Sequence, residues 1–380
     1  MLRILHTADI HLGARHLGLG DTAPVQRERQ AAAFERVVDL ALAERVGAVL
    51  VAGDLFDSQV QHRRTAERVG SALGRLVAAR IPVVITTGCS DPWDAASIHR
   101  AHDLSVLAGS PAGSDLVTVL TSERPWVHLQ AQGLVVSLFG SAGPLPAAPH
   151  VVGIAHAGIA GTVTAVDGAP VLSEAQVAAS GLAYLALGHA HRSASGVAGR
   201  TTWATPGSPE LVRIGVDEPG GVLVVTLGET PAGPTAAVER RTTWRTRHER
   251  RELAVDGLAT REALLAAARV GVDADLVLDL HLVGSRHAAL DLDVSVLEDA
   301  LRRETLFAVV EDRSIAPPWD APMPAPQTVL GSFLRTVGAR CDELAASAAS
   351  ADPEADAEAM ELRETLALGT RLLTGAEVAL

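Results

Sequence analysis

Residues 48–57, with the sequence Ala-Val-Leu-Val-Ala-Gly-Asp-Leu-Phe-Asp, join a continuous apolar run to a polar loop, and this junction decides the fold class. The five apolar residues predict a strand that is buried on both faces, as in a parallel sheet covered by helices. The loop that follows begins at Gly53 and carries two carboxylates, Asp54 and Asp57. Open α/β sheets place their chemistry in loops of this kind, at the carboxyl ends of the strands.

The same alternation extends to both sides of this stretch. Residues 2–6 and 82–86 are strand candidates, and residues 29–44 and 65–79 have apolar positions at helical spacing. The order is therefore strand, helix, strand, helix, strand, which predicts parallel pairing. Further strands are predicted downstream at residues 134–139, 151–155, 184–187 and 222–227.

The composition of the chain limits the classes of function that are possible but does not identify one. The chain has 380 residues, a net charge of −13 and 48% hydrophobic residues, so a large core is available. The acidic balance argues against a general nucleic-acid coat, because phosphate contacts need basic residues. It leaves room for an enzyme that meets DNA through a local patch and metal ions. The two cysteines, Cys89 and Cys341, imply no disulfide framework, and no apolar run reaches membrane length, so we expect a soluble cytoplasmic protein without a membrane partner.

Four short motifs follow predicted strands. They are Asp9-Ile10-His11, the Gly53–Asp57 loop, His156, and Gly188-His189-Ala190-His191. A pair of divalent cations about 3.5–4 Å apart can clamp a phosphate during in-line displacement, and it needs a bridging carboxylate with imidazole and carboxylate ligands on each side. Any one of these motifs alone is more often a chance occurrence or a structural histidine. All four, in this order and each at a strand end, favour a two-metal site.

These motifs carry a resemblance to a known family. The order D-x-H, GDLFD, isolated His and GHxH resembles the calcineurin-like metallophosphoesterases. The GDLFD form, with Ala-Asp-Ile-His-Leu-Gly at residues 8–13, resembles the SbcD-type DNA exonucleases more narrowly. Residues 205–210, Thr-Pro-Gly-Ser-Pro-Glu, resemble a P-G-S-x-E segment of that group, and residues 274–284 resemble a strand of its capping domain. The resemblance implies an α+β fold: a four-layer α/β/β/α sandwich with a small α+β capping domain and a C-terminal helical tail.

The resemblance also implies a ligand set. Asp9, His11 and His191 would hold the first metal ion, Asp54 would bridge both ions, and His156 and His189 would hold the second. Asp57 is not expected to be a ligand itself. It would instead form a hydrogen bond to a liganding imidazole or to the loop.

One motif departs from the family pattern. The family has G-N-H-D after the third strand, where this chain has Gly88-Cys89-Ser90-Asp91. Cys89 replaces an Asn ligand of the second metal, and Ser90 replaces a His that contacts the scissile phosphate. Asp91 remains, and we expect it to lack its usual imidazole partner. Losses of single groups of this kind cost roughly 10²–10⁴-fold in rate.

Two interpretations of Cys89 stay open. Its thiolate can replace the missing ligand, in which case the soft sulfur favours zinc over manganese or magnesium. Alternatively, it is a small buried apolar residue. Two histidines that follow, His99 and His102, could substitute for the missing imidazole, but an exposed helix face is the favoured interpretation for both.

The predicted function is a metal-dependent phosphodiesterase, a DNA exonuclease or endonuclease subunit that acts in double-strand-break repair with an SbcC-like ATPase. The expected cofactors are two divalent ions, Mn²⁺ in the first instance, with the second site weakened. The expected partners are DNA ends, the ATPase and a second copy of the chain. Asp54, Ser90 and Asp91 are the candidate catalytic residues. A non-catalytic scaffold subunit and a small-molecule phosphoesterase are the alternatives.

Three domains are predicted: a nuclease domain at 1–235, a capping or DNA-recognition domain at 246–320, and a helical segment at 326–380 that could bind the ATPase. The apolar stripe of that last segment could equally pack on its own protein. Near the first junction, six arginines surround Trp244, and either a DNA contact or a solvated edge strand would explain them. They are Arg240, Arg241, Arg245, Arg247, Arg250 and Arg251.

Overall fold

The computed structural model describes residues 1–141, 143–161, 170–215, 220–231, 233–287, 290–315 and 324–347, with part of 358–373. The chain divides into two compact units, Met1–His248 and Glu249–Leu380. Both of the six-stranded sheets belong to the first unit.

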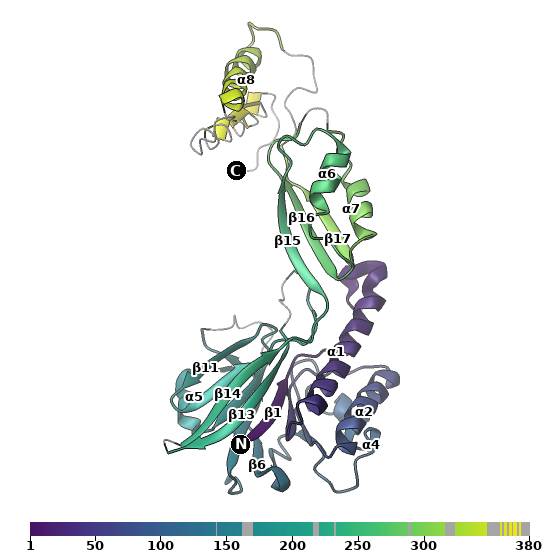
Figure 1. The fold of residues 1–380 in the computed structure, drawn as a ribbon, viewed down its shortest axis with the longest axis vertical. Coiled ribbons are helices and arrows are strands. Elements are labelled where there is room, and N and C mark those ends of the chain that lie inside the picture. The colour runs from purple at the N-terminus through teal and green to yellow at the C-terminus, as the bar shows by residue number, and fades with distance from the viewer. Residues whose placement is uncertain are drawn as a thin grey trace. The chain divides into compact units, whose positions relative to one another are not determined.

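The first sheet of the first unit has the strand order β14-β13-β1-β2-β3-β4. Figure 1 labels the first three strands of this order, β14, β13 and β1. Strands β1 to β4 are parallel, and β13 and β14 extend the sheet in antiparallel fashion. The bounds are β1 Leu2–Thr7, β2 Ala48–Ala52, β3 Val83–Thr86, β4 Val117–Leu120, β13 Val222–Thr230 and β14 Gly233–Arg241. The predicted parallel pairing of the first three strands is confirmed.

Helices α1 (Ala23–Ala43) and α2 (Arg63–Ala78) cover the outer face of this sheet. Phe34 and Val37 of α1 and Leu73 of α2 share a core with Leu5 and Val49 of the strands. The short elements η1 (Leu17–Thr22), α3 (Ile98–Ala101) and α4 (Leu104–Leu107) lie in the connections. The α1 helix begins six residues before the predicted start, because Pro24 lies in its first turn, where a missing N–H costs nothing.

The second sheet has the order β11-β12-β10-β7-β6-β5. Its bounds are β5 Trp126–Leu129, β6 Leu134–Leu138, β7 His150–His156, β10 Tyr184–Gly188, β11 Ala194–Ala198 and β12 Thr201–Thr205. The 3₁₀ turn η2 (Gln130–Gln132) joins β5 to β6.

The two sheets face each other across a second core. Ile4 and Leu50 from the first sheet are buried with Val136, Ile154 and Tyr184 from the second. Neighbours along β1 and β2 thus point into different cores, which explains why those strands are apolar on both faces.

The outer face of the second sheet is covered by α5 (Glu174–Ser180) and by the short ribbon of β8 (Gly158–Ile159) and β9 (Val171–Leu172). Figure 1 shows α1 and α2 on one side of the first unit and α5 on the other, with the sheets between them. The predicted α/β/β/α layering is confirmed.

The second unit contains a three-stranded sheet in the order β15-β16-β17, with bounds Arg247–Ala254, Leu276–Val283 and Phe307–Asp312. Helices α6 (Arg261–Ala268) and α7 (Val294–Arg302) share its core with alternate residues of β16, among them Leu278 and Leu280. Helix α8 (Val329–Ser347) follows, and its Leu334 packs with Leu366 of the next helical stretch. None of the helices in the described part of the chain combines the length and the apolar character that a membrane span requires.

The first unit extends beyond the predicted boundary at residue 235. Near that position β13 and β14 form a hairpin, in which they pair from Thr230 and Gly233 onward. The roles expected for residues 246–320 and 326–380 stay predictions.

Candidate metal centre

Two loops that leave neighbouring strands are tied together by their backbones. The Asp9 N–H donates to the Gly53 carbonyl at 3.2 Å, and the His11 N–H donates to the Asp54 carbonyl at 2.9 Å. Because β1 and β2 are parallel neighbours, their carboxyl ends lie at the same edge of the sheet. The first two predicted motifs therefore present their side chains to one place.

Four of the predicted ligands have a left-handed backbone. The φ angles are 52° for Asp9, 50° for His11, 46° for Asp54 and 78° for His189. Each such residue costs on the order of 1–3 kcal/mol, and strain of this kind gathers at functional sites, where the surrounding structure holds it in place. Here the cross-loop hydrogen bonds supply that support, together with the His189 N–H, which donates to Asp9 Oδ1 at 2.9 Å.

The first group of donor atoms comes from Asp9, His11 and His191, which lie within 4.8 Å of one another. His11 Nε2 is 3.2 Å from His191 Nε2. Asp57 Oδ1 is 3.2 Å from the other ring nitrogen of His11, Nδ1, which is the position expected for a group that orients a liganding imidazole.

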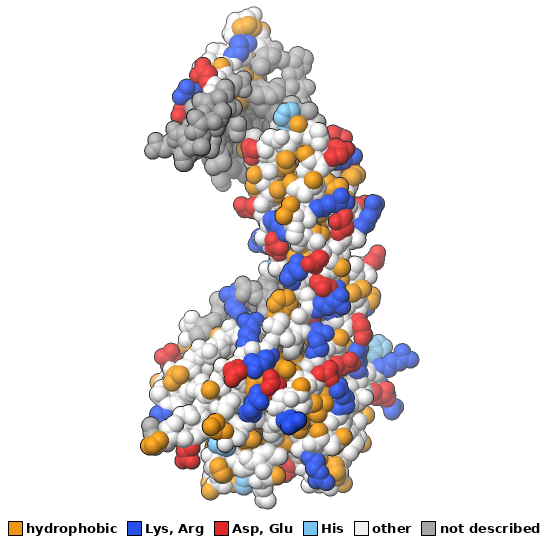
Figure 2. Space-filling view, in the orientation of Figure 1, with side chains coloured by type: hydrophobic (Ala, Val, Ile, Leu, Met, Phe, Trp, Pro, Cys, Tyr) orange, Lys and Arg blue, Asp and Glu red, His pale blue; other side chains and the backbone are white. Residues whose placement is uncertain are grey.

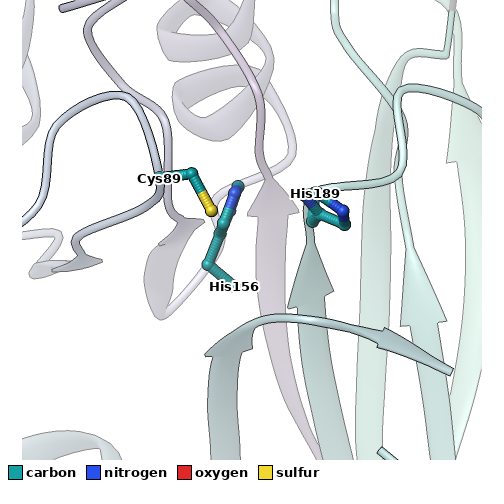
Figure 3. A group of neighbouring side chains, drawn as sticks. All are labelled: Cys89, His156 and His189. Carbon is teal, nitrogen blue, oxygen red and sulfur yellow. The ribbon is translucent and has the colours of Figure 1, made fainter. Parts of the chain in front are cut away.

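The second group comes from Cys89, His156 and His189, whose donor atoms also lie within 4.8 Å of one another. Figure 3 shows the Cys89 sulfur turned toward the His156 ring, with His189 entering from the end of a neighbouring strand. Cys89 follows β3, His156 ends β7 and His189 follows β10. Cys89 is exposed, so the alternative of a buried apolar residue is wrong.

Asp54 lies between the two groups. Its Oδ2 is 3.4 Å from His11 Nε2 and 3.4 Å from His156 Nε2. Ser90 holds the carboxylate from the other side, with its N–H donating to Oδ1 at 2.8 Å and its hydroxyl donating to Oδ2 at 3.1 Å. A single carboxylate shared in this way has the position of a bridging ligand.

The charges of the cluster are strongly coupled. Burial alone would lower the pKa of His156, but Asp54, Cys89 and Asp9 raise it well above its usual value. Burial would raise the pKa of Asp54, but His156 and His11 hold it far below the normal range. The pKa of His189 is lowered by burial and by the neighbouring His156. The carboxylates and imidazoles of the cluster thus compete for the same protons. Bound cations at this place would interact favourably with both kinds of group.

The residues fit a pair of divalent cations. Asp9 Oδ2 and His156 Nε2 are buried without a hydrogen-bond partner, and unsatisfied buried polar atoms of this kind call for a ligand. The donor set mixes carboxylate, imidazole and thiol, which suits transition metals such as manganese and zinc better than calcium. The structure brings together all six side chains on which the sequence prediction rests: Asp9, His11, Asp54, His156, His189 and His191.

Asp91 has an imidazole partner, His99, that differs from the one the family motif would supply at residue 90. His99 Nε2 donates to Asp91 Oδ2 at 3.1 Å, and both side chains are fully buried. The expected exposed helix face is wrong for His99, because its ring packs against Phe56. Asp91 further accepts the N–H groups of Gly88 at 2.8 Å and Phe56 at 3.1 Å. It thereby joins the second loop to the third.

A pocket of about 340 Å³ opens over the centre. Its lining includes the predicted residues His11, Asp54, Asp57, Cys89, Ser90, His189 and His191, and does not include Asp91. Two further lining residues, Val212 and Arg213, were missed by the sequence analysis. Their nearest signal is the segment at 205–210, since Glu210 is buried and its carboxylate accepts the N–H groups of Leu211, Arg245 and Thr246.

The arginines near Trp244 are mostly engaged by the protein. Arg240 donates to the Gly220 carbonyl, Arg241 pairs with Glu44 and Arg250 pairs with Asp279. Arg240 and Arg241 belong to β14, the edge strand of the first sheet, which favours the alternative of a solvated edge. On the face that Figure 2 shows, arginines and acidic side chains lie among one another over the first unit.

The comparisons with known proteins agree with this geometry. Residues 2–193 match the family model described as calcineurin-like phosphoesterase. The chain therefore belongs to the calcineurin-like phosphoesterase family, whose members use a dinuclear metal centre.

Several curated proteins are similar to this chain over stretches of different length. The DNA double-strand break repair protein Mre11 of Aeropyrum pernix is 30% identical over 266 residues, which is 64% of this chain and 63% of that protein. The SbcD component of the nuclease SbcCD from Rhodobacter capsulatus is 35% identical over 125 residues, or 30% of this chain and 29% of that protein. The Mre11 of Saccharolobus solfataricus is 26% identical over 235 residues and 56% of each chain. The chain thus spans less than two thirds of the length of these relatives.

Proposed function

We propose that this protein is a metal-dependent phosphodiesterase that cuts DNA. One observation carries the proposal: Asp54 Oδ2 lies 3.4 Å from an imidazole of each donor group. That arrangement supports a bridging carboxylate between two ions. We propose Asp9, His11 and His191 for the first position and His156 and His189 for the second, with Mn²⁺ as the ion expected at the first.

The remaining residues have distinct roles in this proposal. When bound, the two cations would supply activation of water and neutralisation of phosphate charge. Asp57 orients His11 through its contact with Nδ1. Ser90 fixes the Asp54 carboxylate with two hydrogen bonds, which makes it a positioning residue. Arg213 lies on the pocket wall, where a guanidinium can meet a non-bridging phosphate oxygen.

Asp91 does not line the pocket and acts on the centre through other residues. It is fully buried and takes its hydrogen bonds from the backbones of two loops and from His99. We propose that this pair holds the Cys89–Ser90 turn against Asp54. The imidazole that the altered motif lacks is therefore not replaced inside the pocket by His99, and a reduced rate is expected.

The names of the similar proteins support the choice of DNA as the substrate and of double-strand-break repair as the process. We extend this to an SbcC-like ATPase as the partner and to a homodimer as the assembly. Leu334 of α8 and Leu366 already pack together, so the C-terminal helices have an apolar contact of their own. Leu330, Phe333, Val337 and Leu362 pack against this pair, and the exposed stripe residues Val329, Leu372 and Leu373 would face the ATPase. Deleting residues 326–380 should abolish ATPase binding, and unchanged binding would reject that assignment.

A manganese-dependent nuclease assay on linear duplex DNA tests the main proposal. The parent should cleave and Asp54→Ala should not. Equal background in both would favour the alternative of a non-catalytic scaffold, for which the Cys89-Ser90 change is the supporting observation. Turnover of bis(p-nitrophenyl) phosphate without DNA cleavage would point to a small-molecule phosphoesterase.

A further inference from the structure

We propose that the second metal position is a thiolate site, in which Cys89 is a ligand beside His156, His189 and Asp54, and that it selects a thiophilic ion such as Zn²⁺ over Mn²⁺. The inference rests on the proposed function, because it assumes the two-metal centre. It goes further by assigning a different ion to each position.

The geometry places the sulfur among nitrogen donors. Cys89, His156 and His189 each offer a donor atom within 4.8 Å of the others. The three side chains come from three separate strand ends and converge on one point (Figure 3). Cys89 lines the pocket and is exposed to it, so its thiol can be reached by an ion from solvent.

An independent observation points to a ligand at this position. His156 is only 9% exposed, and its Nε2 has no hydrogen-bond partner although Asp54 Oδ2 is 3.4 Å away. Its other ring nitrogen, Nδ1, is 3.1 Å from the Ala52 carbonyl, so an Nδ1–H can donate there while Nε2 faces the metal position. A histidine that binds a metal usually donates its other ring N–H to a carbonyl or carboxylate in this way.

The proposed set has four donors: the sulfur of Cys89 and the two imidazole nitrogens, which lie within 4.8 Å of one another, and Asp54 Oδ2, which is 3.4 Å from His156 Nε2. This number and these types match the tetrahedral coordination of Zn²⁺. The soft sulfur disfavours manganese and magnesium, which prefer oxygen. In forming the bond, the Cys89 thiol loses its proton to solvent as its sulfur joins the cation. The step releases one proton and changes no oxidation state.

Ser90 is held against Asp54, because its hydroxyl donates to Oδ2 and its N–H donates to Oδ1. A neutral hydroxyl is also outside the thiolate, imidazole and carboxylate ligands that zinc sites use. Asp91 is removed from the pocket by its own three hydrogen bonds. Within the altered motif, Cys89 is thus the side chain left to complete the second position.

Cobalt absorption of the full chain tests the proposal without any activity measurement. Co²⁺ added to metal-free parent protein should give a near-ultraviolet charge-transfer band from the sulfur. The band should vanish in Cys89→Ser and Cys89→Asn and persist in Cys341→Ser, which controls for the other cysteine. Visible cobalt absorption in all four proteins would confirm that each still folds and binds the ion at the first position.

Competition between Zn²⁺ and Mn²⁺ gives a second measurement. The parent should retain Zn²⁺ at one of its two positions, and Cys89→Asn should lose zinc affinity by on the order of 10–100-fold while gaining relative preference for Mn²⁺. Visible cobalt absorption without the charge-transfer band in the parent would overturn the thiolate ligand and leave the proposed function standing. No cobalt absorption at all would overturn both.

Discussion

Replacing Gly88 by alanine should damage the metal centre although no proposed ligand is replaced. A Cβ at this position would lie 2.1 Å from Asp54 Oδ1 and 2.5 Å from the Asp54 backbone nitrogen. Gly88 is not among the residues with positive φ, so the substitution carries no backbone penalty of its own. Its effect would come from the contact with Asp54 alone.

The size of that effect follows from what must move. The carboxylate can rotate away, but the backbone nitrogen cannot, so the third loop has to shift from the second. Overpacking of this kind costs about 1–3 kcal/mol of the free energy of unfolding. A carboxylate that rotates away also leaves its position 3.4 Å from His11 and His156. Metal affinity should then fall on the order of 10–100-fold, as it does when a supporting residue is lost.

Isothermal titration calorimetry with Mn²⁺ and urea unfolding would measure the two effects. Gly18→Ala is the matched control, because no atom lies within 4 Å of its added Cβ and its φ is also not positive. The control should change stability by less than about 0.5 kcal/mol. If Gly88→Ala bound metal with the affinity of the parent, the close packing of the altered motif on Asp54 would not be a feature of the functional centre.

Three further predictions concern other parts of the first unit. Asp91→Ala should lower the free energy of unfolding in urea by roughly 2–5 kcal/mol, because two backbone N–H groups and a buried imidazole lose their acceptor; a loss below about 1 kcal/mol would count against the bracing role. Burial, partly opposed by a hydrogen bond with the Leu187 backbone, lowers the pKa of His6 to about 3 from 6.5. As the pH falls below 6.5 the unfolded state therefore binds a proton that the folded state refuses, and stability should drop by about 1.4 kcal/mol per pH unit from this residue. His6 Nδ1 is 2.8 Å from the Tyr184 hydroxyl, so the variant that removes this titration replaces both residues, His6→Leu with Tyr184→Phe. Urea unfolding at pH 6 and pH 5 should show the slope reduced by this amount in the double variant, and an equal slope in both proteins would contradict it. Arg213→Ala should raise the KM for a phosphodiester by roughly tenfold, about 1.4 kcal/mol for one charge-assisted contact, while calorimetry shows unchanged metal affinity; an unchanged KM would remove Arg213 from the phosphate site.

Much of the centre could be predicted because its ligands follow buried strands. The apolar run at Ala48–Ala52 predicts a parallel strand, and parallel neighbours end at one edge. The strands β1 and β2 end at one edge of the first sheet, and β7 and β10 end at one edge of the second. The packing of the two sheets on each other then brings the motifs at these edges together. The left-handed backbone at Asp9 and Asp54 could not be predicted this way, since nothing in a D-x-H or G-D pattern fixes the φ of a non-glycine residue.

The contacts of the altered motif, residues 88–91, could not be predicted from the sequence for a different reason. His99 lies in a four-residue helix, too short for any periodicity to reveal which side is buried. Its partner Asp91 reaches it across a turn, and such loop geometry follows from packing and not from local pattern. The same holds for Arg213, which is positioned by a loop held by the buried Glu210.

The boundary of the first unit could not be placed from the Pro and Gly residues alone. Pro and Gly residues near 231–234 are as typical of a tight hairpin as of a linker. Only the pairing of β14 with β13 decides between them, because it extends the first sheet by a strand. That strand is rich in charged residues and is therefore suited to an edge.

The number of metal ions bound per chain tests the central claim most directly. Protein stripped with a chelator, reloaded with Mn²⁺ and Zn²⁺ and then desalted would be analysed by inductively coupled plasma mass spectrometry, beside Asp54→Ala. The shared carboxylate of Asp54 predicts two ions in the parent and a clear loss in the variant. A parent that retains no more metal than Asp54→Ala would contradict the paired centre.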